Sequence, residues 1–319
     1  MALMRAGVAA GDPSLASEPA FSARTRLLVV APHPDDETIA TGLLIQRVRA
    51  AGGEVRILML TAGDNNPWPQ RWLERRLWIG AAARRRWGLR RREEVRHALH
   101  HLDVPEQAMQ LLGWPDMGVT DALLQRGEWL VAALADVLDR FMPDLVALPG
   151  LADRHPDHAA AHVSVRLALA GRAMQPQLLT YLIHGREVPG RQLGIAGTTG
   201  QLANKSAALA AHRSQMALSG GRMRRLAARP ERYGVTLPEA VGLLPWQPSP
   251  WLQPWLRLSV VGVAGARSWR WRDAPLRREP DGRFRLRPDA GIGEPRFVRL
   301  ASTLPSPWIF DHWGWCELR

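Results

Sequence analysis

The sequence contains a single cysteine, Cys316, which excludes an internal disulfide and a thiolate cluster around a structural metal. It also lacks an unbroken apolar run of roughly 18 or more residues, so no membrane-spanning helix is expected. The first 25 residues hold no compact apolar stretch, and a secretory signal is therefore not expected. These absences predict a cytoplasmic protein, either free or peripheral to a membrane.

Lysine is almost absent, because Lys205 is the only lysine among 42 basic residues, and the formal net charge is +12. Arginine favours bidentate capture of phosphate or carboxylate over point-charge attraction. A phosphate-bearing substrate, an anionic membrane surface or nucleic acid would each suit this charge. A GC-rich genome that encodes its surface cations as arginine explains the composition equally well. The densest basic run, Arg84 to Arg92, is predicted to be a solvated helix face, with docking on anionic lipid as the functional alternative.

From residue 26 onward, short apolar runs alternate with helical segments, which is typical of βαβ units and a parallel sheet. The predicted fold class is α/β, with a Rossmann-like, mostly parallel sheet and helices on both faces. This domain is expected over residues 26–245, after a flexible N-terminal arm over residues 1–25. Residues 246–319 hold eight of the fourteen tryptophans and many prolines, and they predict a small β-rich extension. Strands are expected near residues 27–31, 55–60, 109–112, 145–148 and 178–183, and helices near residues 36–51, 81–102, 122–141 and 202–216, with another ending near residue 169.

No Gly-x-Gly-x-x-Gly motif follows the first predicted strand, which argues against a nucleotide-binding oxidoreductase. The segment found there is Ala31-Pro32-His33-Pro34-Asp35-Asp36-Glu37. Ligands of open parallel sheets bind at the carboxyl ends of strands, so this is a suitable place for a site. His33 and Asp36 can both point at one ion, and imidazole with carboxylate is a ligand set for first-row metals such as zinc.

A second polar motif, Asp153-Arg154-His155-Pro156-Asp157-His158, follows another predicted strand. It could supply a third ligand and leave one position open for water, while Asp35 is free to act as a general base. A lone histidine at a strand end is usually structural, and an acidic pair before a helix usually caps it. Two His-Pro-Asp clusters, each after a buried strand, together favour a hydrolytic metal site. Because no second acidic cluster suits a two-metal nuclease, no nucleic-acid partner is expected.

These motifs resemble those of the PIG-L/LmbE-like deacetylases, whose signature near the first strand is Ala-His-Pro-Asp-Asp-Glu. In this sequence, a proline replaces the alanine of that signature, and the metal-binding positions are intact. Weaker similarity includes Arg91-x-x-Glu94, the segment Leu112 to Asp116, and the segment Lys205 to Gln215. The resemblance covers about residues 26–235, and the C-terminal 74 residues lie outside it.

The resemblance implies a zinc-dependent hydrolase that removes the N-acetyl group of an N-acetylglucosamine-type conjugate, with a phosphate or lipid carrier among the candidates. Zn²⁺, or another divalent first-row metal, would be bound by His33, Asp36 and His158. Asp35 would be the general base, and His155 would steady the oxyanion or protonate the leaving amine. By the same resemblance, Arg91 and Asp116 would touch the sugar, although Arg90 and Arg92 are alternatives to Arg91.

His184 follows a further predicted strand and is another candidate for substrate contact, although a structural role is the more common one. Two alternatives to an acetyl-specific enzyme stay open at this point. Metal-assisted hydrolysis does not depend on the acyl chain, so a longer fatty or amino-acid amide would also be a suitable substrate. A non-catalytic protein whose aromatic extension binds glycans is the alternative from a different class.

Overall fold

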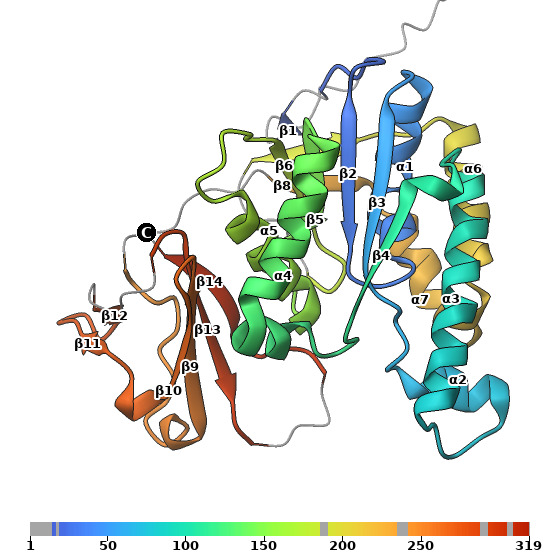
Figure 1. Ribbon diagram of the computed structural model, residues 1–319. Coiled ribbons are helices and arrows are strands. Elements are labelled where there is room, and N and C mark those ends of the chain that lie inside the picture. The colour runs from blue at the N-terminus through green and yellow to red at the C-terminus, as the bar shows by residue number, and fades with distance from the viewer. Residues whose placement is uncertain are drawn as a thin grey trace, which may run out of the picture.

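The computed structural model describes residues 15–16, 19–185, 191–234, 242–287, 293–304 and 309–318. Its main sheet has eight strands in the order β1-β7-β8-β6-β5-β2-β3-β4 (Figure 1). Strands β2 to β6 pair in parallel, whereas β8 is antiparallel to both β6 and β7. The predicted N-terminal arm lies largely outside the described residues. The strands are β1 (Leu15–Ala16), β2 (Arg26–Ala31), β3 (Glu54–Thr61), β4 (Met109–Trp114), β5 (Leu145–Pro149), β6 (Gln177–Tyr181), β7 (Gln192–Ile195) and β8 (Glu231–Gly234).

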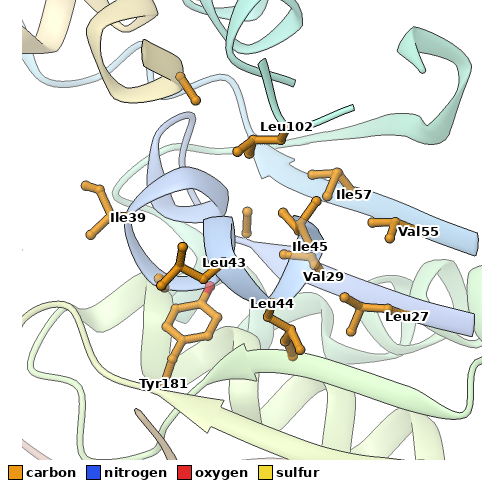
Figure 2. Packing of buried hydrophobic residues seen from close by; sticks show 14 of the residues in the cluster. Leu27, Val29, Ile39, Leu43, Leu44, Ile45, Val55, Ile57, Leu102 and Tyr181 are labelled. Carbon is orange, nitrogen blue, oxygen red and sulfur yellow. The ribbon is translucent and has the colours of Figure 1, made fainter. Parts of the chain in front are cut away.

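The central strands are continuous apolar runs because both faces of the sheet are covered by helices. In β2, Leu27 and Val29 face one core, whereas Leu28 and Val30 face the other. Figure 2 shows the first core, where apolar side chains of α1 (Asp36–Ala50) pack over β2 and β3. This core also includes residues of α3 (Ala81–His101), α6 (Thr199–Ala211) and α7 (Arg213–Ala227). The opposite core includes residues of α4 (Val119–Phe141) and α5 (Pro156–Leu169). The predicted α/β fold, with a mostly parallel sheet and helices on both faces, is confirmed.

The single helix predicted over residues 202–216 is wrong, because α6 ends at Ala211 and α7 begins at Arg213. His212 interrupts the helix with φ −76° and ψ 55°, and its buried Nε2 lies 3.0 Å from Glu37 Oε1. A contact with a residue so far away in the sequence leaves no trace in the local periodicity. The short strands β7 and β8 were missed for the same reason, since their pairing partners lie far along the chain.

The C-terminal residues form a second, antiparallel sheet, which confirms the predicted β-rich extension. One face of this sheet places Val261, Phe297 and Trp315 in the core beneath α4 and α5. Its other face, with Trp271 and Cys316, builds a separate core. The strand order is β10-β9-β13-β14, with β9 (Leu256–Gly262), β10 (Gly265–Arg270), β13 (Arg296–Ser302) and β14 (Gly314–Leu318), beside a hairpin of β11 (Leu276–Arg278) and β12 (Phe284–Leu286).

Candidate active site

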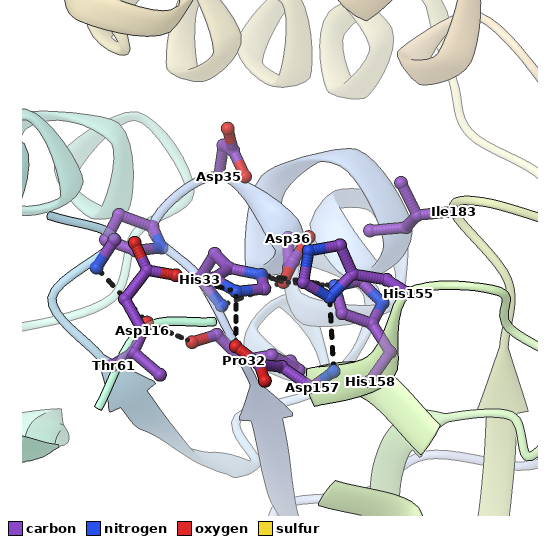
Figure 3. A network of polar contacts seen from close by, with 12 residues as sticks. Pro32, His33, Asp35, Asp36, Thr61, Asp116, His155, Asp157, His158 and Ile183 are labelled. Carbon is purple, nitrogen blue, oxygen red and sulfur yellow. Dashed lines mark hydrogen bonds and ion pairs between the residues drawn. The ribbon is translucent and has the colours of Figure 1, made fainter. Parts of the chain in front are cut away.

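The two polar motifs meet at the carboxyl ends of β2 and β5, which are adjacent parallel strands (Figure 3). His33, Asp35 and Asp36 occupy the turn between β2 and α1. His155 and His158 occupy the start of α5, directly after β5. Strand pairing therefore brings together side chains that are more than a hundred positions apart in the sequence.

Three candidate ligand atoms form a nearly equilateral triangle. His33 Nδ1 lies 3.2 Å from His158 Nε2, and Asp36 Oδ2 lies 3.4 Å and 3.2 Å from these two nitrogens. A tetrahedral zinc ion with bonds of about 2.0–2.1 Å holds its ligands about 3.3–3.4 Å apart. His33, Asp36 and His158 therefore fit three corners of a tetrahedral site, and a ring nitrogen of His155 lies within 4.8 Å of ring nitrogens of His33 and His158.

The charge balance of the cluster also calls for a cation. Asp36, Asp116, Asp153 and Asp157 are buried around two imidazole rings. Burial alone would lower the pKa of His158, but the carboxylates of Asp36 and Asp153 raise this pKa to about 10. The carboxylates thus favour the protonated, positively charged form of His158. A bound divalent cation would supply this positive charge instead of the proton.

The carboxylate of Asp153 lies beside Nδ1 of His158, the ring nitrogen that does not face Asp36. The sequence-based prediction gave Asp153 no role. Its Oδ2 lies 3.2 Å from His158 Nδ1 and accepts hydrogen bonds from the backbone N–H groups of Ile183 and His184. Metal-binding histidines commonly place a carboxylate on the ring nitrogen opposite the metal. Its place in the same motif, five residues before His158, is the signal that could have identified it.

Asp157 has a similar place behind His33. Its Oδ2 lies 3.4 Å from His33 Nε2 and also accepts a hydrogen bond of 2.7 Å from Met117 N. Its Oδ1 accepts a hydrogen bond of 3.0 Å from Val119 N, the first residue of α4. Asp157 thereby links the site to the start of a helix on the other face of the sheet.

Asp35 is separated from Asp36 by its unusual backbone conformation. Its φ is 121°, a value that L-residues rarely adopt and that costs about 1–3 kcal/mol. In Figure 3 the carboxylate of Asp35 points away from the group formed by His33, Asp36 and His158. Burial raises the pKa of Asp35 to about 6, against the opposing effect of the Arg91 guanidinium. A carboxylate with a pKa in this range is suited to exchange protons near neutral pH.

Arg91 holds the turn that carries Asp35. Its guanidinium donates to the carbonyl oxygens of Gly63, at 2.7 Å, and Pro34, and Nη2 lies 3.4 Å from Asp35 Oδ2. Gly63 has φ +60°, and a Cβ at this position would lie 2.0 Å from Arg91 Nη1, so glycine is required. Arg91 also lines the pocket, and its predicted contact with a sugar stays a prediction.

Asp116 was predicted to touch the sugar. In the structure its carboxylate lies against the ring of His33. Its Oδ1 lies 3.3 Å from His33 Nε2, and its Oδ2 accepts a hydrogen bond of 2.5 Å from Asn65 N. Burial would raise the pKa of Asp116, but His33 and Asn65 hold this pKa below its ordinary value. Asp116 is therefore an anion that both supports His33 and borders the pocket.

His155 and His184 complete the histidine cluster on the extension side of the site. The ring of His155 lies 4.6 Å from that of His33 and 5.4 Å from that of His184. Burial and the neighbouring imidazoles lower the pKa of His155, and burial with His158 lowers the pKa of His184 to about 3. His155 Nδ1 accepts a hydrogen bond from Asp157 N, which leaves the proton of the neutral ring on Nε2.

A cavity of about 340 Å³ opens beside these residues. It is bordered by His33, Asp35, Asp36 and His155, together with Arg91, Asp116 and His184, so seven of the eight predicted site residues line it. His158 is fully buried beneath it. Asn65 and Trp68 also line the pocket, together with Met223, Ile309 and Phe310, and the last three come from segments that the sequence-based prediction did not place at the site.

Comparison with known proteins places these motifs within a recognised domain. Residues 28–169 match the model of a family described as PIG-L: GlcNAc-PI de-N-acetylase. A 1D-myo-inositol 2-acetamido-2-deoxy-alpha-D-glucopyranoside deacetylase from Mycolicibacterium vanbaalenii is 29% identical over 177 residues, which is 50% of this chain and 59% of the relative. The protein of the same name from Nocardia farcinica is 35% identical over 153 residues, which is 43% of this chain and 49% of the relative. The chain thus spans between about half and three fifths of the length of these relatives.

The fold is also found among solved structures. The N,N'-diacetylchitobiose deacetylase from Pyrococcus horikoshii superposes with a TM-score of 0.51 at 20% identity, over 66% of this chain and 84% of that protein. The segment matched by the family model begins in β2 and ends with α5, and it therefore contains both polar motifs of the site. Residues 28–169 of this chain are therefore similar to the PIG-L family.

Proposed function

We propose that the protein is a metal-dependent N-deacetylase that hydrolyses the acetamide of an N-acetylglucosamine-type conjugate. The observation that carries this proposal is the triangle of His33 Nδ1, Asp36 Oδ2 and His158 Nε2, with edges of 3.2–3.4 Å, beside the carboxylate of Asp35. The names of the two curated relatives support it, because both are deacetylases of a 2-acetamido-2-deoxyglucopyranoside.

The donor set is suited to Zn²⁺, and another divalent first-row metal would also find nitrogen and oxygen ligands here. When bound, such an ion lowers the pKa of water from about 15.7 toward about 7 and polarises the carbonyl of the amide. His33, Asp36 and His158 would hold the ion. Asp153 and Asp157 would orient the two imidazoles from behind, at 3.2 Å and 3.4 Å.

The remaining steps are proton transfers and charge stabilisation by the residues of this chain. Asp35 would accept the proton of the attacking water at a carboxylate oxygen and deliver it to the amine nitrogen as the carbon–nitrogen bond breaks. The Nε2–H of His155 would donate a hydrogen bond to the negatively charged carbonyl oxygen. Water and the amide are thereby converted into acetate and a free amino sugar.

Acetate release from N-acetylglucosamine conjugates, with and without a chelator, tests the proposal. In the Asp35→Asn variant we expect the rate to fall by about 10²–10⁴-fold while the bound metal is retained, because only the proton acceptor is lost. The matched control is Asp103→Asn, since the Asp103 side chain is 81% exposed and remote from the pocket. Metal-loaded protein that releases no acetate from any such conjugate would overturn the assignment.

We further propose that the sugar is carried by a phosphate- or lipid-linked group at an anionic membrane. The support is a surface around α2 (Pro67–Glu74), where Trp72 and Trp78 are 66% and 88% exposed next to Arg71, Arg75 and Arg76. Aromatic and cationic side chains together are typical of proteins that dock on anionic lipid. Trp68 borders both this α2 surface and the catalytic pocket, so docking would bring the pocket to the membrane. Within the described part of the chain, no helix is long and apolar enough to cross a bilayer.

Sedimentation with vesicles tests this second part of the proposal. Vesicles of phosphatidylcholine with phosphatidylglycerol should bind the protein, whereas vesicles of phosphatidylcholine alone should bind it less. The variant Trp72→Ala/Trp78→Ala should lose most of this binding, and Trp251→Ala/Trp255→Ala is the matched control, because these tryptophans are 74% and 51% exposed on the extension. Equal binding of both variants to anionic vesicles would exclude the α2 surface as the docking site.

A further inference from the structure

The C-terminal extension reaches the catalytic pocket through Ile309 and Phe310, which both line it. The ring centroid of Phe310 lies 5.1 Å from that of His184 and 6.2 Å from that of His155. Both residues lie outside the segment that matches the family model, which ends at residue 169. This wall of the pocket is therefore supplied by the extension rather than by the segment that matches the PIG-L family model.

Two contacts of Asp311, the residue after Phe310, fix the position of this segment. The backbone N–H of Asp311 donates to the carbonyl oxygen of Arg154 at 2.8 Å, directly before His155 in the catalytic motif. The Asp311 carboxylate accepts a hydrogen bond of 2.6 Å from Arg299 Nη2, and both side chains are mostly buried. Phe310 is thus held against the site by bonds to its own sheet and to the loop that carries His155.

The pocket is lined by both polar and apolar side chains. Asn65, Arg91 and Asp116 supply hydrogen-bonding groups, as a sugar requires, and so do Gln215, Ser219 and Arg222 of α7. Ile183, Met223, Leu226, Ile309 and Phe310 also line the pocket but offer only apolar side chains. Ile309 is 52% exposed, so part of the apolar lining that the extension supplies is in contact with solvent. Exposed apolar surface in a concave site favours a ligand that covers it with hydrocarbon.

We propose that Ile309 and Phe310 form the outer wall of an apolar subsite that binds a hydrocarbon group of the substrate. The inference rests on the proposed deacetylase function. It adds that the substrate carries a hydrocarbon group, which N-acetylglucosamine by itself lacks. The hydrocarbon would be either an acyl chain longer than acetyl or an apolar group of the aglycone. Each buried methylene is worth about fourfold in affinity, from about 0.8 kcal/mol, so three methylenes give about 60-fold.

Two substrate series distinguish the sources of the hydrocarbon. One series varies the N-acyl group of glucosamine from acetyl to octanoyl, and the other varies the glycoside of N-acetylglucosamine from methyl to octyl. In the wild type, kcat/KM should rise with chain length in one series, mainly through KM. The loss of kcat/KM in Ile309→Ala/Phe310→Ala relative to the wild type should grow with chain length, by about 60-fold for three buried methylenes. Leu304→Ala is the control, because Leu304 is 45% exposed on the extension and does not line the pocket.

A loss of kcat/KM that is the same at every chain length in the double variant would refute the subsite. A wild-type kcat/KM that does not change with chain length in either series would also refute it. Binding of the two reaction products needs no turnover and separates this inference from the proposed function. Octanoate probes the acyl source, and octyl glucosaminide probes the aglycone source, both by calorimetry on metal-loaded protein. Product binding that the double variant weakens, in a protein without acetate release, would retain the subsite and overturn the deacetylase. Acetate release with no chain-length preference would retain the deacetylase function and overturn the subsite.

Discussion

Replacing Lys205, the only lysine of the chain, should be one of the most damaging single changes outside the active site. Lys205 is 2% exposed, and its Nζ lies 2.6 Å from Glu231 Oε1. The same carboxylate accepts hydrogen bonds from the backbone N–H groups of Leu43 and Leu44, at 2.7 Å and 2.9 Å, in the middle of α1. Lys205 therefore neutralises a buried anion that holds the first helix of the domain to β8.

The local packing explains why a lysine is found here in a protein that otherwise uses arginine. A Cβ at Gly42 would lie 3.0 Å from Lys205 Cγ, so the lysine stem runs closely along the glycine of α1. An arginine would bring five N–H donors into a buried place where one carboxylate oxygen meets the lysine ammonium. A compact ammonium on a narrow stem suits this place better than a planar guanidinium.

The magnitude follows from removing one partner of a buried ion pair, which costs about 3–5 kcal/mol because the other charge is left uncompensated. We expect Lys205→Met to lower the free energy of unfolding in urea by this amount, whereas Arg85→Met, at an exposed position of α3, should change it by less than about 0.5 kcal/mol. The variant Lys205→Met/Glu231→Gln should recover part of the loss, because the uncompensated charge is removed. A change of less than about 1 kcal/mol in Lys205→Met would refute this account of the pair.

Three further variants test the site and its surroundings. Asp153→Asn should weaken metal binding by about 10–100-fold in a competition with a chelator, because the carboxylate behind His158 is lost, and unchanged affinity would contradict its positioning role. His33→Ala should remove bound metal, whereas Asp35→Asn should retain it, and elemental analysis of the purified variants distinguishes a ligand from a base. Burial lowers the pKa of His162 from 6.5 to about 4, so the folded protein keeps it neutral where the unfolded chain takes up a proton. This contribution to stability is present above about pH 6.5 and is lost as the pH falls toward 4, by up to about 3 kcal/mol. His162→Gln should therefore flatten the loss of unfolding free energy between pH 7 and pH 4.5, and parallel curves for variant and wild type would exclude this role.

The main sheet and the location of the site could be predicted because each rests on local patterns. Continuous apolar runs indicated β2 and β5, and parallel strands place the loops at their carboxyl ends on one edge of the sheet. The residue types of the two His-Pro-Asp motifs then indicated a metal. The roles of Asp35, Asp36 and His158 were taken from a family resemblance, and they stay predictions until the variants are measured.

By itself, the sequence determined the α/β class, the β-rich extension and the place where polar side chains would gather, because strand periodicity and chain order are local properties. Only the tertiary structure decided which atoms meet. It placed three candidate ligand atoms within 3.4 Å of one another, set Asp153 behind His158, and brought Phe310 from the extension into the pocket. It also gave Lys205 its partner. These contacts join residues that are distant in the chain, and they depend on how sheets and helices pack rather than on any pattern that a single segment carries.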